Sequence, residues 1–177
     1  MRDIFFHTNN QKVLRFLVEN NDEAKSTSEI RLATAVSKAG VSLALRFLVE
    51  QELVKKEVRG KTYFYRSVSE CVVIKQLKIL ISINKLYQLI GKISPYAERV
   101  ILFGSASRGE NLPDSDIDLL VISRDKDSVR RILKKFKKLT IKPIIKTPLG
   151  LEELKEKEPL FFAEAKRGII LFDKNER

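Results

Sequence analysis

The sequence FGSASRGENLPDSDIDLLV, residues 103–121, decides the fold of the C-terminal half of the chain. It ends one apolar run and begins another, and the residues between them include the breakers Gly109 and Pro113. This pattern predicts two buried strands joined by a loop. Asp116 and Asp118 stand two residues apart at the start of the second run, so they are expected to share one face of its strand.

The aspartate pair belongs to a chain with a formal net charge of +11, and the repulsion within the pair calls for a cation. Two carboxylates on alternate strand residues offer the oxygen ligands that Mg²⁺ prefers, so Asp116 and Asp118 are the predicted metal ligands. Magnesium commonly takes its other ligands from substrate phosphates. Gly104 would let the backbone approach a phosphate closely, Ser105 would add an amide and a hydroxyl, and Arg108 would pair with a phosphate oxygen or hold the aspartates.

These residues resemble a known signature. Gly104-Ser105, then ten residues, then Asp116-x-Asp118, with Arg108-Gly109 between, is similar to the motif of the polymerase-beta-type nucleotidyltransferases. The likeness is to their small, minimal members, some of which act as antitoxins, and it spans residues 97–173. The resemblance implies that a nucleoside triphosphate binds with Mg²⁺ as cofactor. It also implies that Asp116 and Asp118 are catalytic in transferring a nucleotidyl group to a protein or nucleic-acid hydroxyl.

The family usually supplies a third carboxylate from the strand that follows the intervening helix. Here that strand, LTIKPIIKT at residues 139–147, has no acid and carries Lys142 and Lys146. The nearest later carboxylates are Glu152 and Glu153. We therefore expect an enzyme that lacks an obvious third catalytic carboxylate. The alternative is a DNA-binding transcriptional regulator, or an antitoxin-like partner of a toxin, with a degenerate nucleotidyltransferase domain.

The rest of the C-terminal half alternates helix and strand patterns. Residues 127–139 have an amphipathic helical period, residues 139–146 form a strand, residues 151–168 are mostly helical, and residues 169–173 form a last short strand. The predicted fold class is α+β, with a mixed nucleotidyltransferase-like sheet and its helices packed on one face.

The N-terminal third predicts three helices and a hairpin, over roughly residues 9–68. Ser26 and Glu29 have the spacing of a capping box, and two short strands meet at residues 59–61. This order resembles a winged helix-turn-helix domain, in which the third helix enters the major groove of DNA and the wing contacts phosphate. The residues that the resemblance places against DNA are Lys38, Ser42, Arg46, Lys55, Lys56, Arg59, Lys61 and Arg66. The third helix has few base-reading side chains, so a structural or protein-docking role is the alternative.

A long apolar helix connects the two parts. Its apolar positions cover more than one stripe, which predicts burial on two sides and a homodimer. The expected domains are a winged helix at 1–69, a connecting helix at 70–94 and a nucleotidyltransferase-like domain at 95–177. Lysines interrupt the apolar run, so no membrane span is expected, and Cys71 is the single cysteine of a chain expected to be cytoplasmic.

Overall fold

The computed structural model describes residues 5–137 and 139–176. The chain has mixed α and β structure and divides into two compact units, Met1–Lys78 and Ile79–Arg177. Helix α4 (Val72–Ile93) contains the point of division, so its first turns belong to the first unit and the rest to the second. Each unit is described by itself.

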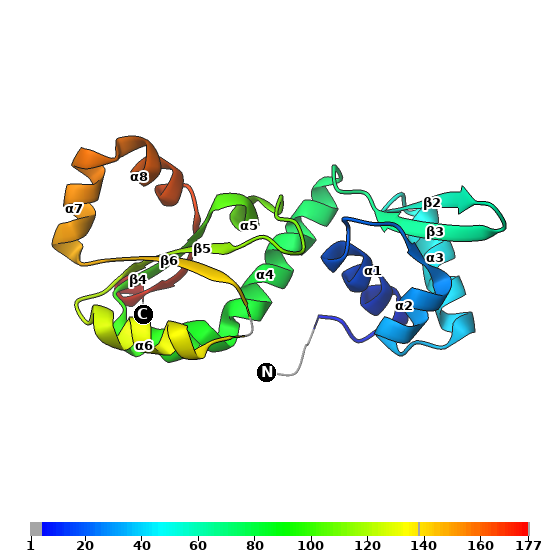
Figure 1. The fold of residues 1–177 in the computed structure, drawn as a ribbon, viewed down its shortest axis with the longest axis horizontal. Helices are drawn as coiled ribbons and strands as arrows, with labels where there is room; N and C mark the ends of the chain where they lie inside the picture. The colour runs from blue at the N-terminus through cyan, green and yellow to red at the C-terminus, as the bar shows by residue number, and fades with distance from the viewer. Residues whose placement is uncertain (1–4, 138, 177) are drawn as a thin grey trace. The chain divides into compact units, whose positions relative to one another are not determined.

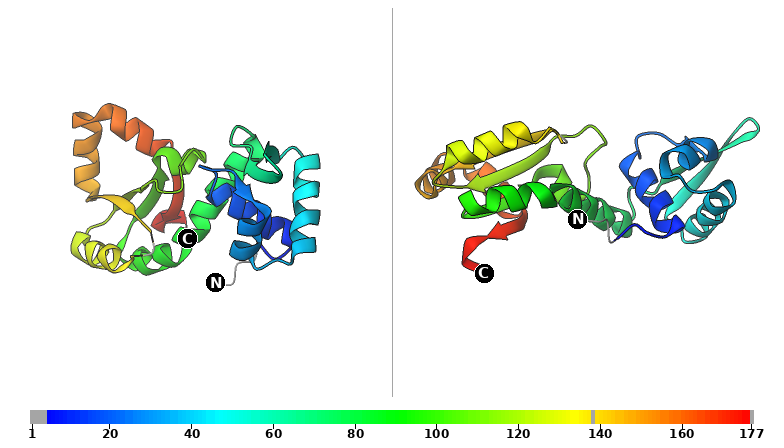
Figure 2. Two further views of the ribbon diagram at one scale, coloured as in Figure 1. Left: turned by 45° about the vertical axis from the view of Figure 1, so that its right-hand side comes forward. Right: turned by 90° about the horizontal axis from the view of Figure 1, so that it is seen from below.

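The first unit combines three helices with a small antiparallel sheet. The helices are α1 (Asn9–Glu19), α2 (Thr27–Thr34) and α3 (Lys38–Glu50). The strands are β1 (Lys25–Ser26), β2 (Val54–Arg59) and β3 (Thr62–Ser67), in the order β1-β3-β2. The β2–β3 hairpin turns at Gly60, where φ is +62°, and it projects beyond the helices (Figures 1 and 2). The predicted helices and hairpin are therefore present.

Local capping explains where these helices begin. Ser26 and Glu29 form the predicted capping box, in which each side chain accepts a hydrogen bond from the other residue's backbone amide. Thr8 and Gln11 form a second box at α1, and the Ser37 hydroxyl accepts from the amide of Gly40 at α3. The helices then bury one side each around a core that includes Val13, Leu17, Ile30, Val41, Leu45 and Leu48.

No single helix in the described residues is long and apolar enough to cross a membrane. Helices α2 and α3 pass the length and composition test only as a pair, and a bend of 113° separates them.

The second unit is built on a four-stranded mixed sheet with the order β6-β5-β4-β7 (Figure 1). The strands are β4 (Arg99–Phe103), β5 (Ile117–Ile122), β6 (Ile141–Lys146) and β7 (Ile169–Asp173). Strand β4 runs antiparallel to β5 and β7, whereas β5 and β6 are parallel and are joined through α6 (Lys126–Lys135). The prediction of a mixed sheet is confirmed.

Helices cover both faces of this sheet, so the prediction that they pack on one face is wrong. On one face, α4 and α6 lie side by side against Val100, Leu102, Leu119 and Val121 (Figures 1 and 2). On the other, α7 (Pro148–Lys157) and α8 (Pro159–Lys166) pack against Ile101, Phe103, Leu120 and Ile122. The physical reason is that β4 and β5 are apolar at every core position, so a sheet covered on one face would expose half of them.

Two local elements also differ from expectation. The segment after β4 begins with a short helix, α5 (Gly104–Arg108), where a loop was predicted. The helical stretch after β6 divides at Glu158, because Pro159 at the first position of α8 has no amide hydrogen to continue α7.

Candidate functional site

Gly104 stands at the junction of β4 and α5, in a conformation that favours glycine. Its φ is +69°, in the left-handed region. A Cβ added there would lie 3.2 Å from Cγ of Asp118 and nearer still to its Oδ2 atom. The Asp118 carboxylate therefore lies directly against the backbone of Gly104.

Helix α5 holds the serines and Arg108 in a tight turn beside that junction. The Ser107 hydroxyl donates to the Gly104 carbonyl at 2.8 Å. The helix ends at Gly109, whose φ is +68°, and the Gly109 and Glu110 amides both donate to the carbonyl of Ser105. Gly104, Ser105 and Arg108 are thus fixed on one helical turn that starts where the central strand ends.

The two aspartates sit at the start of β5. Asp116 precedes the strand, and Asp118 is its second residue, opposite Phe103 on β4 and Lys142 on β6. Leu120 and Ile122, which have the same parity as Asp118, pack on the α7–α8 side of the sheet. By strand alternation, Asp118 faces that side as well.

Negative charge around Asp118 is only partly compensated. Burial raises the pKa of its carboxyl group, Lys142 lowers it, and the nearby carboxylates of Asp116 and Glu164 raise it further. The result is a pKa above the ordinary aspartate value. Oxygen donors in such partly desolvated, net anionic surroundings fit a hard divalent cation, although Lys142 opposes one.

Besides Asp116, the carboxylate that raises the pKa of Asp118 is Glu164 on α8. Sequence reasoning missed this residue. Glu152 and Glu153, the candidates from the sequence, are exposed on α7. In the described residues no group of three His, Cys, Asp or Glu side chains is placed to hold a metal ion, so Glu164 does not complete a three-carboxylate metal site here. Its large separation from Asp118 along the chain left no signal in the local sequence pattern.

Arg108 contacts two carboxylates other than the aspartates. Its Nε donates to Glu110 Oε2 at 2.8 Å, and its Nη1 donates to Glu164 Oε1 at 3.5 Å. Both interactions raise the pKa of the guanidinium, and the hydrogen bond with Glu110 has the larger effect. A cavity of about 430 Å³ lies between α5 and α8, and Arg108, Glu164 and Arg167 contribute to its lining. The cavity is also lined by Leu160 and Ala163, so it is a largely apolar recess that carries charged side chains beside α5.

Helix α8 is held beside the site by its apolar side. The rings of Phe161 and Phe103 meet edge to face, with centroids 5.4 Å apart, and Ala165 is fully buried. Phe103 directly precedes Gly104, so this contact ties the helix that carries Glu164 to the strand end that positions the glycine.

In the first unit, the predicted DNA-facing residues of α3 are exposed but share their face with apolar side chains. Lys38, Ser42 and Arg46 are exposed. Leu43 and Phe47 are exposed on the same helix, and Arg46 lies 3.9 Å from the Glu50 carboxylate. This face offers few groups for reading base edges.

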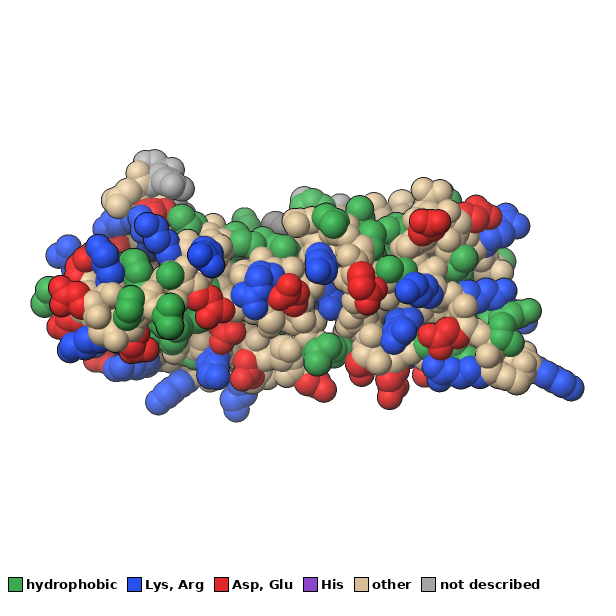
Figure 3. All heavy atoms as spheres, turned by 90° about the horizontal axis from the view of Figure 1, so that it is seen from above, with side chains coloured by type: hydrophobic (Ala, Val, Ile, Leu, Met, Phe, Trp, Pro, Cys, Tyr) green, Lys and Arg blue, Asp and Glu red, His purple; other side chains and the backbone are tan. Residues whose placement is uncertain are grey.

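The hairpin carries the other predicted cations on two faces. Lys55, Arg59 and Arg66 share a face with Glu57, which pairs with Arg59 at 2.8 Å and with Arg66 at 3.8 Å. On the opposite face, the Lys56 ammonium lies 3.6 Å from the ring centroid of Tyr63. Lys61 is at the turn. On the side of the molecule shown in Figure 3, Lys and Arg side chains are interspersed with Asp and Glu and do not form one basic patch.

One protein-family model matches part of the second unit. Residues 83–170 match the model of the family described as "Nucleotidyltransferase domain". This stretch includes the Gly104 junction, both aspartates and Glu164. No curated protein sequence matches the chain significantly.

Several solved structures resemble parts of the chain at low identity. A single-residue mutant of ZitR from Lactococcus lactis is 19% identical over 52% of this chain, with a TM-score of 0.38; the chain spans 65% of its length, slightly under two thirds. A putative nucleotidyltransferase from Sulfolobus solfataricus is 18% identical, with a TM-score of 0.41, over 58% of this chain and 89% of its own. TrmBL2, an archaeal chromatin protein, is 16% identical, with a TM-score of 0.33. The match covers 92% of this chain and 71% of TrmBL2.

Proposed function

We propose that the second unit binds a nucleoside triphosphate with Mg²⁺ and transfers its nucleotidyl group to a hydroxyl of a protein or nucleic acid. The match of residues 83–170 to the nucleotidyltransferase domain supports nucleotidyl transfer in general terms. The observation that carries the proposal for this chain is the position of Asp118 against Gly104, which sets a carboxylate beside backbone that only glycine fits.

Each residue has a role in this proposal. Asp116 and Asp118 would hold the cation, which neutralises triphosphate charge in the transition state when bound. The Gly104–Ser105 turn would offer its backbone amides and the Ser105 hydroxyl to a phosphate group. Arg108 would exchange a carboxylate partner for a phosphate oxygen, since a guanidinium forms strong paired hydrogen bonds with either group.

The acceptor hydroxyl must lose its proton for transfer, and the side chains around Asp118 offer little help with that step. The position opposite Asp118 on β6 is Lys142, a cation, and Glu164 is the further carboxylate with an effect on Asp118. We therefore expect nucleotide binding to be robust and transfer to be slow.

Nucleotide binding and transfer should be measured separately on the full chain. Calorimetry with each of the four ribonucleoside triphosphates and Mg²⁺ reports binding, and transfer of α-labelled nucleotide to protein or RNA reports activity. Asp116→Ala/Asp118→Ala should weaken binding by at least about 10–100-fold, the range found for groups that merely orient metal ligands.

Asp114→Ala is the matched control, since Asp114 is an exposed acid in the same loop. It should bind as the wild type does. Equal binding by the double variant and the wild type, or no binding by the wild type, would contradict the proposal.

We also propose that the first unit is a winged helix that contacts nucleic-acid phosphate through the β2–β3 hairpin. The support is the set of exposed cations at Lys55, Lys56, Arg59, Lys61 and Arg66 on a projecting hairpin. Such contacts displace condensed counterions, so binding should fall steeply as salt rises. Because α3 exposes Leu43 and Phe47, we expect little discrimination between sequences.

Fluorescence anisotropy with two unrelated duplexes over a salt series tests this second proposal. Lys56→Ala/Lys61→Ala should weaken binding to both duplexes and reduce the salt slope by about 2, because each lysine neutralises one phosphate. Lys92→Ala, an exposed lysine on α4, is the control. No binding at low salt would exclude the proposal without affecting that for the second unit.

A further inference from the structure

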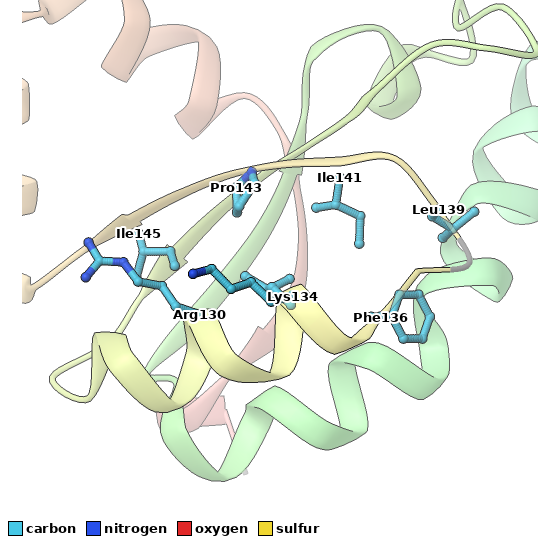
Figure 4. A pocket seen from close by; sticks show the side chains of 8 residues that line it. Arg130, Lys134, Phe136, Leu139, Ile141, Pro143 and Ile145 are labelled. Carbon is cyan, nitrogen blue, oxygen red and sulfur yellow. The ribbon is translucent and has the colours of Figure 1, made fainter.

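An apolar groove lies between α6 and the edge strand β6, away from the Gly104 junction. It has a volume of about 550 Å³. Figure 4 shows Ile141, Pro143 and Ile145 of β6 pointing toward α6, with Phe136 near the end of the groove. These side chains lie on the α4–α6 side of the sheet, whereas Asp118 faces the α7–α8 side. The groove is therefore separate from the candidate nucleotide site.

The groove combines an apolar floor with a cationic rim. Arg130 and Lys134, which are one helical turn apart on α6, are exposed along it (Figure 4). Arg130 is 3.2 Å from the Asp127 carboxylate, an exposed pair of a kind that contributes little and exchanges partners readily. A complementary occupant would present an apolar side chain flanked by carboxylates at matching spacing.

The edge of β6 disfavours a strand as occupant. The carbonyls of Thr140 and Lys146 accept from the amides of Ile117 and Ser123, so even-numbered residues direct their backbone groups toward β5. Odd-numbered residues then direct theirs outward, and the central one is Pro143, which has no amide hydrogen. A strand added at this edge would lose its central hydrogen bond, so the groove suits side chains presented by a helix.

Helix α7 of the same chain presents such a face. Leu149, Glu152, Glu153 and Glu156 are exposed at helical spacing, and Leu149 is 73% exposed. Glu152 and Glu156 are one turn apart, which is also the spacing of Arg130 and Lys134. The opposite side of α7 packs within its own molecule through buried Leu154. Glu153 pairs with Lys157 at 3.7 Å, whereas Glu152 and Glu156 are exposed to solvent.

We propose that the groove between α6 and β6 receives helix α7 of a second copy of the chain. Leu149 of one copy enters the apolar groove of the other, and Glu152 and Glu156 pair with Lys134 and Arg130 on its rim. The contact joins two different surfaces, so it is heterologous and forms either a closed ring or a longer chain. Because its rim is ionic and exposed, association weakens as salt rises.

A charge-exchange experiment on the full chain tests this contact. The variants are Arg130→Glu/Lys134→Glu, with an acidic groove, and Glu152→Lys/Glu156→Lys, with a basic α7. Sedimentation velocity over a concentration series at low salt should show association of the wild type. Each variant alone should remain monomeric, since its groove and α7 then have the same sign of charge. An equimolar mixture should associate again, because each groove meets an α7 of opposite charge.

Two further variants separate the contact from misfolding and from general charge effects. Leu149→Glu alters a side chain that is largely exposed, so it should fold normally by circular dichroism and fail to associate. Lys135→Glu/Lys137→Glu changes the same net charge beside the groove without altering its lining and should associate as the wild type does. A monomeric wild type, variants that associate alone, or a mixture that stays monomeric would each overturn the proposal.

Discussion

At the scale of single residues, Gly104 is constrained both by its backbone conformation and by the Asp118 carboxylate beside it. Gly104→Ala should destabilise the fold by about 1–2 kcal/mol from the left-handed backbone alone. It should also displace the Asp118 carboxylate, because the new methyl group would overlap it. Urea denaturation and nucleotide binding by calorimetry measure the two effects.

The control for this change is Gly91→Ala, in helix α4. A methyl group there meets no atom within 4 Å, so we expect a gain of about 0.5–1 kcal/mol from helix propensity. A Gly104→Ala protein that keeps wild-type stability and binding would contradict the geometry of the junction.

Asp118 should reduce stability at neutral pH in the absence of divalent cations. Its folded-state pKa is raised, chiefly by burial, so the ionised carboxylate is disfavoured in the folded protein. That penalty is present above the folded-state pKa and disappears as pH falls below the unfolded-state value. Asp118→Asn should therefore have a higher melting temperature than the wild type at pH 7, with EDTA present.

The difference between Asp118→Asn and the wild type should vanish in acid. Thermal melts from pH 7 to pH 3 check this, and Asp114→Asn, on the exposed loop, provides the comparison. A lower melting temperature for Asp118→Asn at pH 7 would show that Lys142 more than offsets the burial of the carboxylate.

Sequence reasoning could propose the glycine and the aspartates as site residues because their constraints are local. Close approach and strand alternation are readable within a few residues of Gly104 and Asp118. Lys142 was assigned to the strand after the intervening helix, but its position opposite Asp118 depends on the β5–β6 register, and Glu164 was missed because its position depends on the docking of α8. Neither is encoded in a short window of sequence.

At the scale of elements, the docking of α8 onto β4 supports the site. Phe161→Ala removes the edge-to-face contact with Phe103 and should destabilise the second unit by up to about 3 kcal/mol. Hydrogen exchange should show faster exchange in α8, while the amides of β5 remain protected. The helix that carries Glu164 would then be loosened before the sheet opens.

Leu160→Ala provides the control on the same helix. Leu160 is 88% exposed, so its removal should change stability by no more than about 0.5 kcal/mol. Equal effects of the two substitutions would mean that Phe161 does not anchor α8.

Element types were predicted better than their packing. Hydrophobic period and capping predicted α1, α3, α6 and the strands, since these signals arise within each segment. The prediction that helices cover one face of the sheet was wrong. A continuous apolar strand such as RVILF indicates burial on both faces, but the prediction assigned helices to one face only.

At the scale of the whole molecule, the two units have separate hydrophobic cores. Leu45 is 2% exposed in the first core, and Leu45→Ala should destabilise that unit by about 2–5 kcal/mol. Hydrogen exchange should increase in α1 and α3 and remain unchanged in β4 and β5. Loss of protection in both units together would show that they unfold as one cooperative body.

The ion pairs of Arg108 with Glu110 and Glu164 would affect how nucleotide and metal binding influence each other. A phosphate group that captured this guanidinium would take Arg108 away from Glu164, and Glu164 already acts on Asp118. The released negative charge would strengthen the attraction for a divalent cation at the aspartates. Nucleotide and magnesium would then bind with positive heterotropic linkage, each raising the affinity of the other by the same factor.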